Sequence, residues 1–307
     1  MTDGIMDLFL TKPAFLLARV DQICTALYAA RSGGETLAQA ELLLLLAQSD
    51  ERDQISLSRA AGVDKSTTAL ILDNLAGNGL IERIADPQDR RRARPRLTAA
   101  GRIRAAAAHM AFVGLQGELT EPLTREAAED LTILLRLIAE SAEGPAPPWA
   151  SDEAPAFLAT APSLLNRRAL QVAQAHFLAC AAPLSLTPRQ FSMLVILLAR
   201  PGMTQVGFSR LFGLDPSTTG LIMRNLLARG LIVDRVSPHD RRKRVHSITP
   251  AGLDAIHAAQ PLVDRSERMT TASLDSDQVA RLIAHLQRLV FAHSPRLRFP
   301  GELQTVA

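Results

Sequence analysis

The chain contains the same segment twice, and this repetition is the feature that most restricts how it can fold. Residues 55–101 and 206–252 are related by a constant shift of 151 positions, and 21 of the 47 aligned positions are identical without a gap. The run Asp89-Arg90-Arg91, for example, recurs as Asp240-Arg241-Arg242. Self-similarity at a fixed spacing indicates a duplicated structural unit. The function therefore has to be argued from two copies of one unit.

Length and composition indicate two helical domains. A chain of 307 residues allows two domains of about 150 residues, and 47% hydrophobic with only 4% aromatic residues favours a globular helical protein. A proline-rich stretch without apolar periodicity predicts a linker between the repeats, with Trp149 fixing it to a domain surface. We expect a first domain at residues 1–142, the linker at 143–156 and a second domain at 157–307.

Both repeats show the same order of expected elements. Helices are predicted at 15–30, 40–48, 56–61, 99–114 and 125–140, and at 164–180, 189–200, 205–212, 250–271 and 276–293. A further helix begins after Asp64 or Asp215, both suitable N-caps, and stops at the glycine that precedes a strand pair. The first strand of each pair is predicted at residues 80–85 and 231–236. Pro95 interrupts the first return strand and is expected to distort it.

Positive charge is concentrated beside the turn of each strand pair. The formal net charge is only +3, but arginines and one lysine cluster at Arg90, Arg91, Arg92, Arg94 and Arg96, and at Arg241, Arg242, Lys243 and Arg244. Basic projections of this kind neutralise phosphates. A solvated charge run without function is the alternative, and recurrence at the same repeat position argues against it.

A helix, a turn, a capped helix and a basic two-stranded ribbon form the winged helix-turn-helix arrangement, in which the capped helix enters the major groove of DNA. The series Gly-Leu-Ile, Asp-Pro-x-Asp-Arg-Arg and Leu-Thr-x-x-Gly at residues 79–101 resembles the MarR family of bacterial transcription regulators. Residues 230–252 are similar, with Ser237 in place of the first aspartate. The resemblance implies a mainly α fold with small β-wings, built as two winged helix-turn-helix domains with a shared helical pseudo-dimerisation core.

Candidate DNA contacts follow from the resemblance. The groove-facing residues would be Lys65, Ser66, Thr67 and Asn74, and Ser217, Thr218, Arg224 and Asn225. The wing contacts would be Arg90, Arg91, Arg92, Arg241, Arg242, Lys243 and Arg244, with Asp89 and Asp240 orienting the wing arginines. Helix capping is the alternative role for Ser66 and Ser217. Leu70 and Leu221 stand where many relatives carry arginine, so strong guanine contacts are not expected there.

Two sensing mechanisms remain open. Arg19, Arg167 and Arg168 on the first helices could clamp the carboxylate of a small aromatic effector; solvation or pairing with acidic residues is the alternative. Cys24 and Tyr28 resemble a first-helix pair of the organic hydroperoxide regulators in the same family, and a phenol near a thiolate could stabilise it. An inert buried thiol is the alternative for Cys24, and for Cys180.

No metal-ligand spacing, nucleophile motif or phosphate-cradling glycine loop is found, so we expect no metal, no cofactor and no enzymatic activity. We also expect no membrane association and a cytoplasmic location. The leading hypothesis is a sequence-specific DNA-binding regulator, acting as a repressor. It would work as an intrachain pseudo-dimer on double-stranded DNA, released by an aromatic or phenolic effector or an oxidant, with further homo-oligomerisation open. The alternative is a protein-interaction module or anti-repressor that has lost operator binding.

Overall fold

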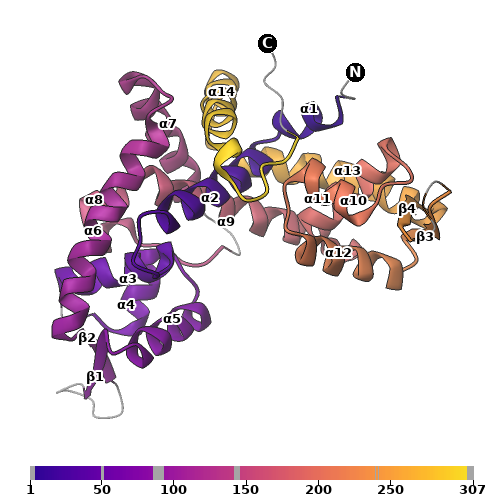
Figure 1. The fold of residues 1–307 in the computed structure, drawn as a ribbon. Helices are drawn as coiled ribbons and strands as arrows, with labels where there is room; N and C mark the ends of the chain where they lie inside the picture. The colour runs from indigo at the N-terminus through magenta and orange to yellow at the C-terminus, as the bar shows by residue number, and fades with distance from the viewer. Residues whose placement is uncertain are drawn as a thin grey trace. The chain divides into compact units, whose positions relative to one another are not determined.

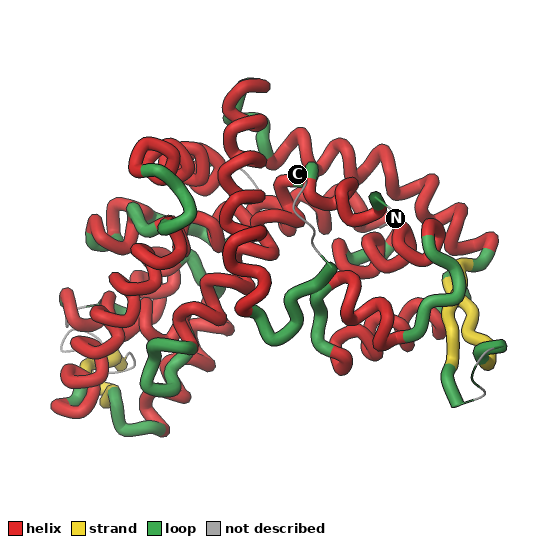
Figure 2. The backbone as a smooth tube through the Cα atoms, turned by 45° about the horizontal axis from the view of Figure 1, so that its top comes forward, coloured by secondary structure: helices red, strands yellow, loops and turns green. Residues whose placement is uncertain are grey.

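The computed structural model describes residues 4–49, 52–85, 93–141, 146–238, 240 and 242–302. Helices dominate this part of the chain, and strands occur in only two short ribbons (Figure 2). The expected fold class, mainly α with small β-wings on two winged helix-turn-helix domains, is therefore confirmed. Element labels are those of Figure 1.

The elements of the two repeats correspond closely. The first repeat contains α1 (Ile5–Leu10), α2 (Pro13–Ala29), α3 (Leu37–Gln48), α4 (Gln54–Ala61), α5 (Lys65–Gly77), β1 (Ile81–Ala85), β2 (Ala93–Leu97), α6 (Ala99–Thr120) and α7 (Arg125–Glu140). The second contains α8 (Ala156–Ala159), α9 (Pro162–Ala181), α10 (Pro188–Ala199), α11 (Gln205–Phe212), α12 (Pro216–Ala228), β3 (Ile232–Val236), β4 (Arg244–Ile248), α13 (Pro250–Thr270) and α14 (Ser276–His293). Short 3₁₀ helices lie at Ser151–Glu153, Ala182–Leu184 and Ser294–Arg296.

Three helices differ from expectation. The short helices α1 and α8 were not predicted, and α6 continues to Thr120 where a stop at Gly114 was expected. An internal glycine costs a helix about 1 kcal/mol. Leu115 and Leu119 beyond it are fully buried, and burying each leucine contributes about 1.5–3 kcal/mol. Core packing therefore extends the helix past its weak position.

The chain forms two compact units whose boundary crosses the repeats. The repeat-one unit comprises residues 20–141 and 146–171, and the repeat-two unit comprises residues 4–19 and 172–302. Each repeat thus gives the first part of its long helix, α2 or α9, to the unit that the other repeat builds. A helix that starts in one unit continues into the other.

In the repeat-two unit the exchanged segment belongs to the core. Phe9 and Phe15 pack against Phe212, with ring centroids 5.5 Å apart in each pair. The side chain of Gln287 donates to the carbonyl of Leu10 at 3.0 Å. Repeat two on its own would lack these partners.

The repeat-one unit receives the start of α9 in a similar way. The amide of Gln116 donates to the hydroxyl of Ser163 at 2.8 Å and accepts from its backbone N–H at 3.1 Å. Leu164 and Leu165 are fully buried. The core of repeat one is therefore completed by residues 157–171, which belong to repeat two.

The two ribbons share one register. β1 pairs with β2 from Ile81 opposite Leu97 to Ala85 opposite Ala93, and β3 pairs with β4 at the positions shifted by 151. The expected distortion at Pro95 is wrong for the described strands. Thr98 N–H bonds to the Leu80 carbonyl, and bonded pairs alternate in an antiparallel ladder, so the position of Pro95 opposite Arg83 requires no donor across the ribbon.

Pro95 instead accounts for a difference at the outer edge of the ribbon. In repeat two, His246 donates its backbone N–H to the Met203 carbonyl at 2.8 Å. This bond forms an isolated antiparallel β-bridge at the outer edge of the ribbon. Pro95 is the counterpart of His246 and has no N–H. Within the described residues of repeat one no such bridge is present.

The glycine that ends the Leu-Thr-x-x-Gly series permits a close approach between the wing and the following helix. A Cβ atom on Gly101 would lie 1.8 Å from the Leu80 carbonyl oxygen, and one on Gly252 would lie 2.1 Å from that of Leu231. Thr98 and Thr249 cap α6 and α13 beside these glycines. The motif thus joins the ribbon to the long helix at a fixed angle.

In the described part of the segment between the repeats, Trp149 fixes the chain to the repeat-one unit, as predicted. Trp149 donates its indole N–H to the carbonyl of Ala60 at 3.2 Å, and the guanidinium of Arg168 lies 5.5 Å from the ring centroid. The backbone N–H of Ala150 bonds to Arg59 at 3.1 Å.

No single helix within the described ranges is long and apolar enough to cross a bilayer. One pair of helices bent by 68°, residues 162–184 with 188–199, reaches that length and composition only when the two are taken together.

Candidate nucleic-acid interface

Both capped helices begin in the same way. The Asp64 carboxylate accepts from the Thr67 N–H at 2.9 Å and from the Ser66 hydroxyl at 2.5 Å. These hydrogen bonds, from Ser66 first and then Thr67, lower the pKa of Asp64 to about 2. Asp215 accepts from the Thr218 N–H at 2.9 Å, and hydrogen bonds from Thr218 lower its pKa as well. The hydroxyl of Ser66 is thus engaged in the cap, as the capping alternative anticipated.

Side chains on the preceding helix fix the turn of each motif. Ser58 donates its hydroxyl to the Val63 carbonyl and Ser209 does so to Leu214, at 2.5 Å in both repeats. These serines were not predicted to have a role. Their identity in both copies was the available signal, because polar residues retained on an otherwise apolar helix face need a partner.

A second tie connects the starts of the two helices in each motif. The amide of Gln54 donates to the Lys65 carbonyl at 3.1 Å, and Gln205 donates to the Pro216 carbonyl at 2.8 Å. Together with the serine bonds, these contacts hold α4 against α5 and α11 against α12. The capped helices are therefore presented rigidly.

The predicted groove-facing residues lie on the outer faces of α5 and α12. All are exposed except Thr218, which is half-buried: Lys65, Ser66, Thr67, Asn74, Ser217, Arg224 and Asn225. The opposite faces enter the core through Thr68, Leu72 and Leu75, and through Thr219, Ile222, Met223 and Leu226. Ile71, between these two faces, is half-buried.

The two asparagines of this face are tied to the preceding helix. The Asn74 side-chain oxygen accepts from Gln39 at 2.7 Å, and that of Asn225 accepts from Gln190 at 2.8 Å. Gln39 and Gln190 also complete the capping boxes of α3 and α10. The asparagines therefore brace the capped helix, and each retains side-chain N–H donors for other contacts.

The ribbon tip of repeat two carries exposed positive charge. Arg242, Lys243 and Arg244 are exposed, and Asp240 accepts from the Arg242 backbone N–H at 3.0 Å and pairs with Lys243 at 3.2 Å. The pKa of Asp240 is lowered by these contacts, the Arg242 hydrogen bond first. Arg244 pairs with Asp234. Asp240 thus orders the tip through backbone and lysine contacts.

Several predicted wing residues lie outside the described residues: Asp89, Arg90, Arg91, Arg92 and Arg241. In the described part of the first ribbon, Arg96 is exposed and Arg94 is half-buried.

The repeats differ at one position of the outer helix face. Asp73 in α5 corresponds to Arg224 in α12, and both are exposed. Asp73 forms an ion pair with Arg83 of β1. Repeat two therefore presents a cation where repeat one presents a carboxylate that is already paired with its own wing.

The three candidate effector-binding arginines have protein partners. Arg19 donates to the carbonyls of Gly213 at 3.3 Å and Pro300 at 2.5 Å, and burial lowers its pKa to about 10. Arg168 donates to Gln171 at 2.6 Å, and its pKa is also lowered to about 10 by burial.

Arg167, the third arginine, lies in the repeat-one unit beside a buried carboxylate. It donates to Glu41 at 2.6 Å and to the Ala61 carbonyl at 3.0 Å. Glu41 is fully buried, which raises its pKa, and Arg167 opposes that shift. Arg167 and Arg19 are related in this respect, because each comes from the segment that its repeat gives to the other unit. Arg167 reaches the end of α4 at Ala61, and Arg19 reaches the residue that follows α11, Gly213.

The proposed thiol–phenol pair is arranged differently from the expectation. Tyr28 donates its hydroxyl to Glu35 at 2.8 Å, and Glu35 also pairs with Arg104 at 3.1 Å. Burial, and then this carboxylate, raise the pKa of Tyr28. Cys24 is buried, and burial raises the pKa of its thiol well above 9.0. A neutral thiol is stabilised there. Half-buried Cys180 donates to the sulfur of Met269 at 3.8 Å.

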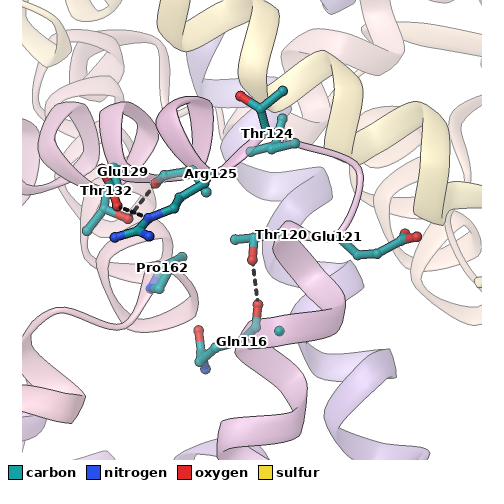
Figure 3. A pocket seen from close by; sticks show the side chains of 11 residues that line it. Gln116, Thr120, Glu121, Thr124, Arg125, Glu129, Thr132 and Pro162 are labelled. Carbon is teal, nitrogen blue, oxygen red and sulfur yellow. Dashed lines mark hydrogen bonds and ion pairs between the residues drawn. The ribbon is translucent and has the colours of Figure 1, made fainter.

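Two hollows lie in the repeat-one unit, and neither is lined by the candidate sensor residues. The first lies between the end of α6, the start of α7 and Pro162 (Figure 3), where Thr120 bonds to Gln116 and Arg125 pairs with Glu129. The second is mainly apolar and lies between α3, β2 and α6. Its lining includes Leu44, Leu46, Leu97 and Met110, together with the polar side chains of Arg102 and His109.

Within the described ranges, no group of three or more histidine, cysteine or acidic side chains is arranged to hold a metal ion.

The fold and the repeated site define a tandem winged helix-turn-helix protein. Two models of the MarR family match the chain, one at residues 36–93 and the other at residues 184–243. The chain belongs to the MarR family and carries two MarR-type domains in tandem.

Individual relatives each match less than half of the chain. The putative transcriptional regulatory protein for the hcr operon of Thauera aromatica is 31% identical over 103 residues, which are 34% of this chain. The matched part spans 62% of the length of that curated relative. The repressor CouR, bound to a 23-mer DNA duplex, is 35% identical over 40% of this chain and 87% of its own, with a TM-score of 0.38. Bordetella bronchiseptica BpsR, whose DNA binding is regulated by 6-hydroxynicotinic acid, is 26% identical over 41% and 89%, with a TM-score of 0.39.

Proposed function

We propose that this protein is a sequence-specific DNA-binding transcriptional regulator that acts as a repressor in the cytoplasm. The observation that carries the proposal is the repetition of one presented helix. The capped helices α5 and α12 have the same N-cap, the same serine and glutamine ties and the same wing register. Polar outer faces next to basic ribbons suit a DNA duplex, in which the groove is read by the helix and phosphates are contacted by the wing.

We further propose that the two repeats act as an intrachain pseudo-dimer. The exchange of residues 4–19 and 157–171 between the units supports this assignment, because each repeat is incomplete without a helix start from the other. Linking two DNA-binding units also makes the second contact intramolecular, at high effective concentration. In this proposal, the domain limits expected from the sequence are the limits of the duplicated segments. Each folded unit combines most of one repeat with the start of the other.

Effector control is part of the proposal, and the apolar hollow between α3, β2 and α6 is the site that fits it best. Leu44, Leu97 and Met110 offer an apolar lining, and exposed Arg102 offers a cation for a carboxylate. A small aromatic acid has both properties. Because β2 belongs to the wing, occupancy would bias the ribbon. The buried, protonated thiol of Cys24 disfavours an oxidant as the signal.

The test is footprinting of the purified chain on DNA upstream of its own gene. One chain is expected to protect about two helical turns, roughly 20 base pairs. Affinity should fall with salt concentration at a logarithmic slope of about −0.9 per neutralised phosphate. Benzoate and 4-hydroxybenzoate serve as effector probes and are expected to weaken binding. Equal affinity for this DNA and for random DNA would contradict the proposal.

A protein-interaction module is the second candidate, and the exposed leucines at positions 70 and 221 favour it. The variant Arg242→Ala distinguishes the two. A DNA-binding protein loses affinity for DNA and part of its salt dependence, whereas an interaction module retains its partner.

A further inference from the structure

We propose that Leu70 and Leu221 are specificity-determining residues that contact the C5-methyl group of a thymine, one in each half-site of the operator. This inference rests on the proposed function, because it requires α5 and α12 to enter the major groove. It goes beyond that function by naming the base and the chemical group that the centre of each helix face recognises.

The two leucines are exposed at equivalent positions. Leu70 is 70% exposed and Leu221 is 63% exposed, and they are related by the same shift of 151 positions as the rest of the repeat. At 3.6 residues per turn, Leu70 projects about 200° around the helix axis from buried Thr68. Each leucine therefore lies at the centre of the face directed away from the core.

On this face, the residues one turn before and two turns after each leucine are small. Ser66 and Gly77 flank Leu70 one turn before and two turns after it, and Ser217 and Ala228 flank Leu221 in the same way. The small residues allow close approach to a surface, and each leucine is bordered on its other side by polar residues, Asp73 and Asn74 in α5 and Arg224 and Asn225 in α12. A single exposed leucine is ordinary, but the same exposed leucine at the centre of both presented faces indicates a shared contact.

The surroundings of the leucines favour nucleic acid over a protein surface. Lys65 lies at the start of α5, and exposed Arg224 follows Leu221 on α12. In repeat two, Arg242 and Lys243 of the wing add further exposed charge. In repeat two, an apolar centre within a basic field matches the major groove at an A·T pair, where thymine presents a methyl group between phosphate backbones. In repeat one, Leu70 lies between Lys65 and Asp73, and Asp73 is paired with Arg83.

The leucines are also held in place before binding. The caps at Asp64 and Asp215 and the asparagine–glutamine ties fix each helix at its start and along its outer face. Because these side chains are already ordered, little of the free energy gained by burying a methyl group is lost to ordering them on binding. Burying one methyl contributes about 0.8 kcal/mol, which corresponds to about a fourfold change in affinity.

The experiment uses the full chain and the DNA duplex defined by footprinting. Each thymine is replaced in turn by deoxyuridine, which removes the 5-methyl group and keeps the base pair. The wild-type protein is expected to lose about fourfold in affinity at one thymine in each half-site. Leu70→Ala should abolish this sensitivity in one half-site only, and Leu221→Ala in the other. Ile103→Ala, an equally exposed apolar residue on α6, is the matched control and should retain both sensitivities.

The outcomes separate the inference from the proposed function. Absence of sequence-dependent DNA binding overturns the proposed function and this inference with it. Salt-dependent, sequence-specific binding that is insensitive to every deoxyuridine overturns the inference alone. Retention of both sensitivities in the leucine variants also overturns it, and then the leucines would face a protein surface instead. Thermal unfolding of each variant checks that it is folded.

Discussion

The guanidinium of Arg167 lies 2.6 Å from the carboxylate of Glu41, and the two residues come from different repeats. Arg167→Met leaves a buried carboxylate without its cation, and we expect a loss of about 3–5 kcal/mol in the free energy of unfolding at pH 8. Chemical denaturation measures it. The control is Arg125→Met, which breaks the exposed pair with Glu129 and should change the free energy by less than about 0.5 kcal/mol.

The same variant should show a defined pH dependence. Burial raises the pKa of Glu41 above 4.5, so the folded state binds its proton more tightly than the unfolded state does. The stability from this group is fully present below pH 4.5 and is lost as pH rises through the folded pKa. Without Arg167 that pKa rises further, and the deficit should therefore be smallest near pH 4.5 and largest at pH 8. An equal deficit at both values would contradict this account.

Removing a cap should destabilise the presented helix in a pH-dependent manner. Asp64→Ala is expected to lower the free energy of unfolding by about 1 kcal/mol at pH 7, because the hydrogen bond from the Thr67 N–H to the Asp64 carboxylate is lost at the start of α5. The folded pKa of Asp64 is lowered to about 2 from 3.8, so its contribution is present above pH 3.8 and disappears as pH falls through about 2. Wild type and variant should converge in stability toward pH 2, as measured by urea denaturation. Asp152→Ala, outside the motif, should show no such convergence.

Gly101 tests the close approach of the wing to α6. Gly101→Ala places a Cβ atom 1.8 Å from the Leu80 carbonyl oxygen, and we expect a loss of about 1–3 kcal/mol from overpacking. Gly117→Ala in the same helix meets no atom within 4 Å, and should stabilise the protein by about 0.5–1 kcal/mol through helix propensity. Opposite signs for the two variants in thermal unfolding are the expected result; equal signs would refute the steric explanation.

The two cysteines should differ in reactivity. Cys24 is buried with a raised thiol pKa, whereas Cys180 is half-buried. Iodoacetamide at pH 8 is expected to label Cys180 in the native protein and Cys24 only after unfolding, because the thiolate is the reactive form. Mass spectrometry of labelled peptides gives the two rates. Rapid labelling of Cys24 in the native protein would contradict this prediction and would favour an oxidant-sensing role for this thiol.

Features set by neighbouring residues were predictable from the sequence. The caps at Asp64 and Asp215 depend on contacts three residues apart, and the ribbons that follow pair two consecutive strands; both were predicted. The extension of α6 past Gly114 was not, because it depends on burial of Leu115 and Leu119.

Contacts between distant residues were beyond sequence reasoning. Arg19 was a candidate for ligand binding, but its partners Gly213 and Pro300 are far along the chain. Tyr28 was paired with Cys24 on helical spacing, whereas Glu35 is its hydrogen-bond partner. Several side chains of the sequence could accept a hydrogen bond from the Tyr28 hydroxyl, and only the fold determines that Glu35 is the one within hydrogen-bonding distance.

The exchange of helix starts also orders events during synthesis. Residues 4–19 are synthesised before residues 172–302, which build the rest of the unit that contains them. At about 5–20 residues per second, this leading segment waits on the order of ten seconds for its partners. During that interval the apolar side chains of Met6, Phe9 and Leu10, which are buried in the folded repeat-two unit, lack the residues that cover them.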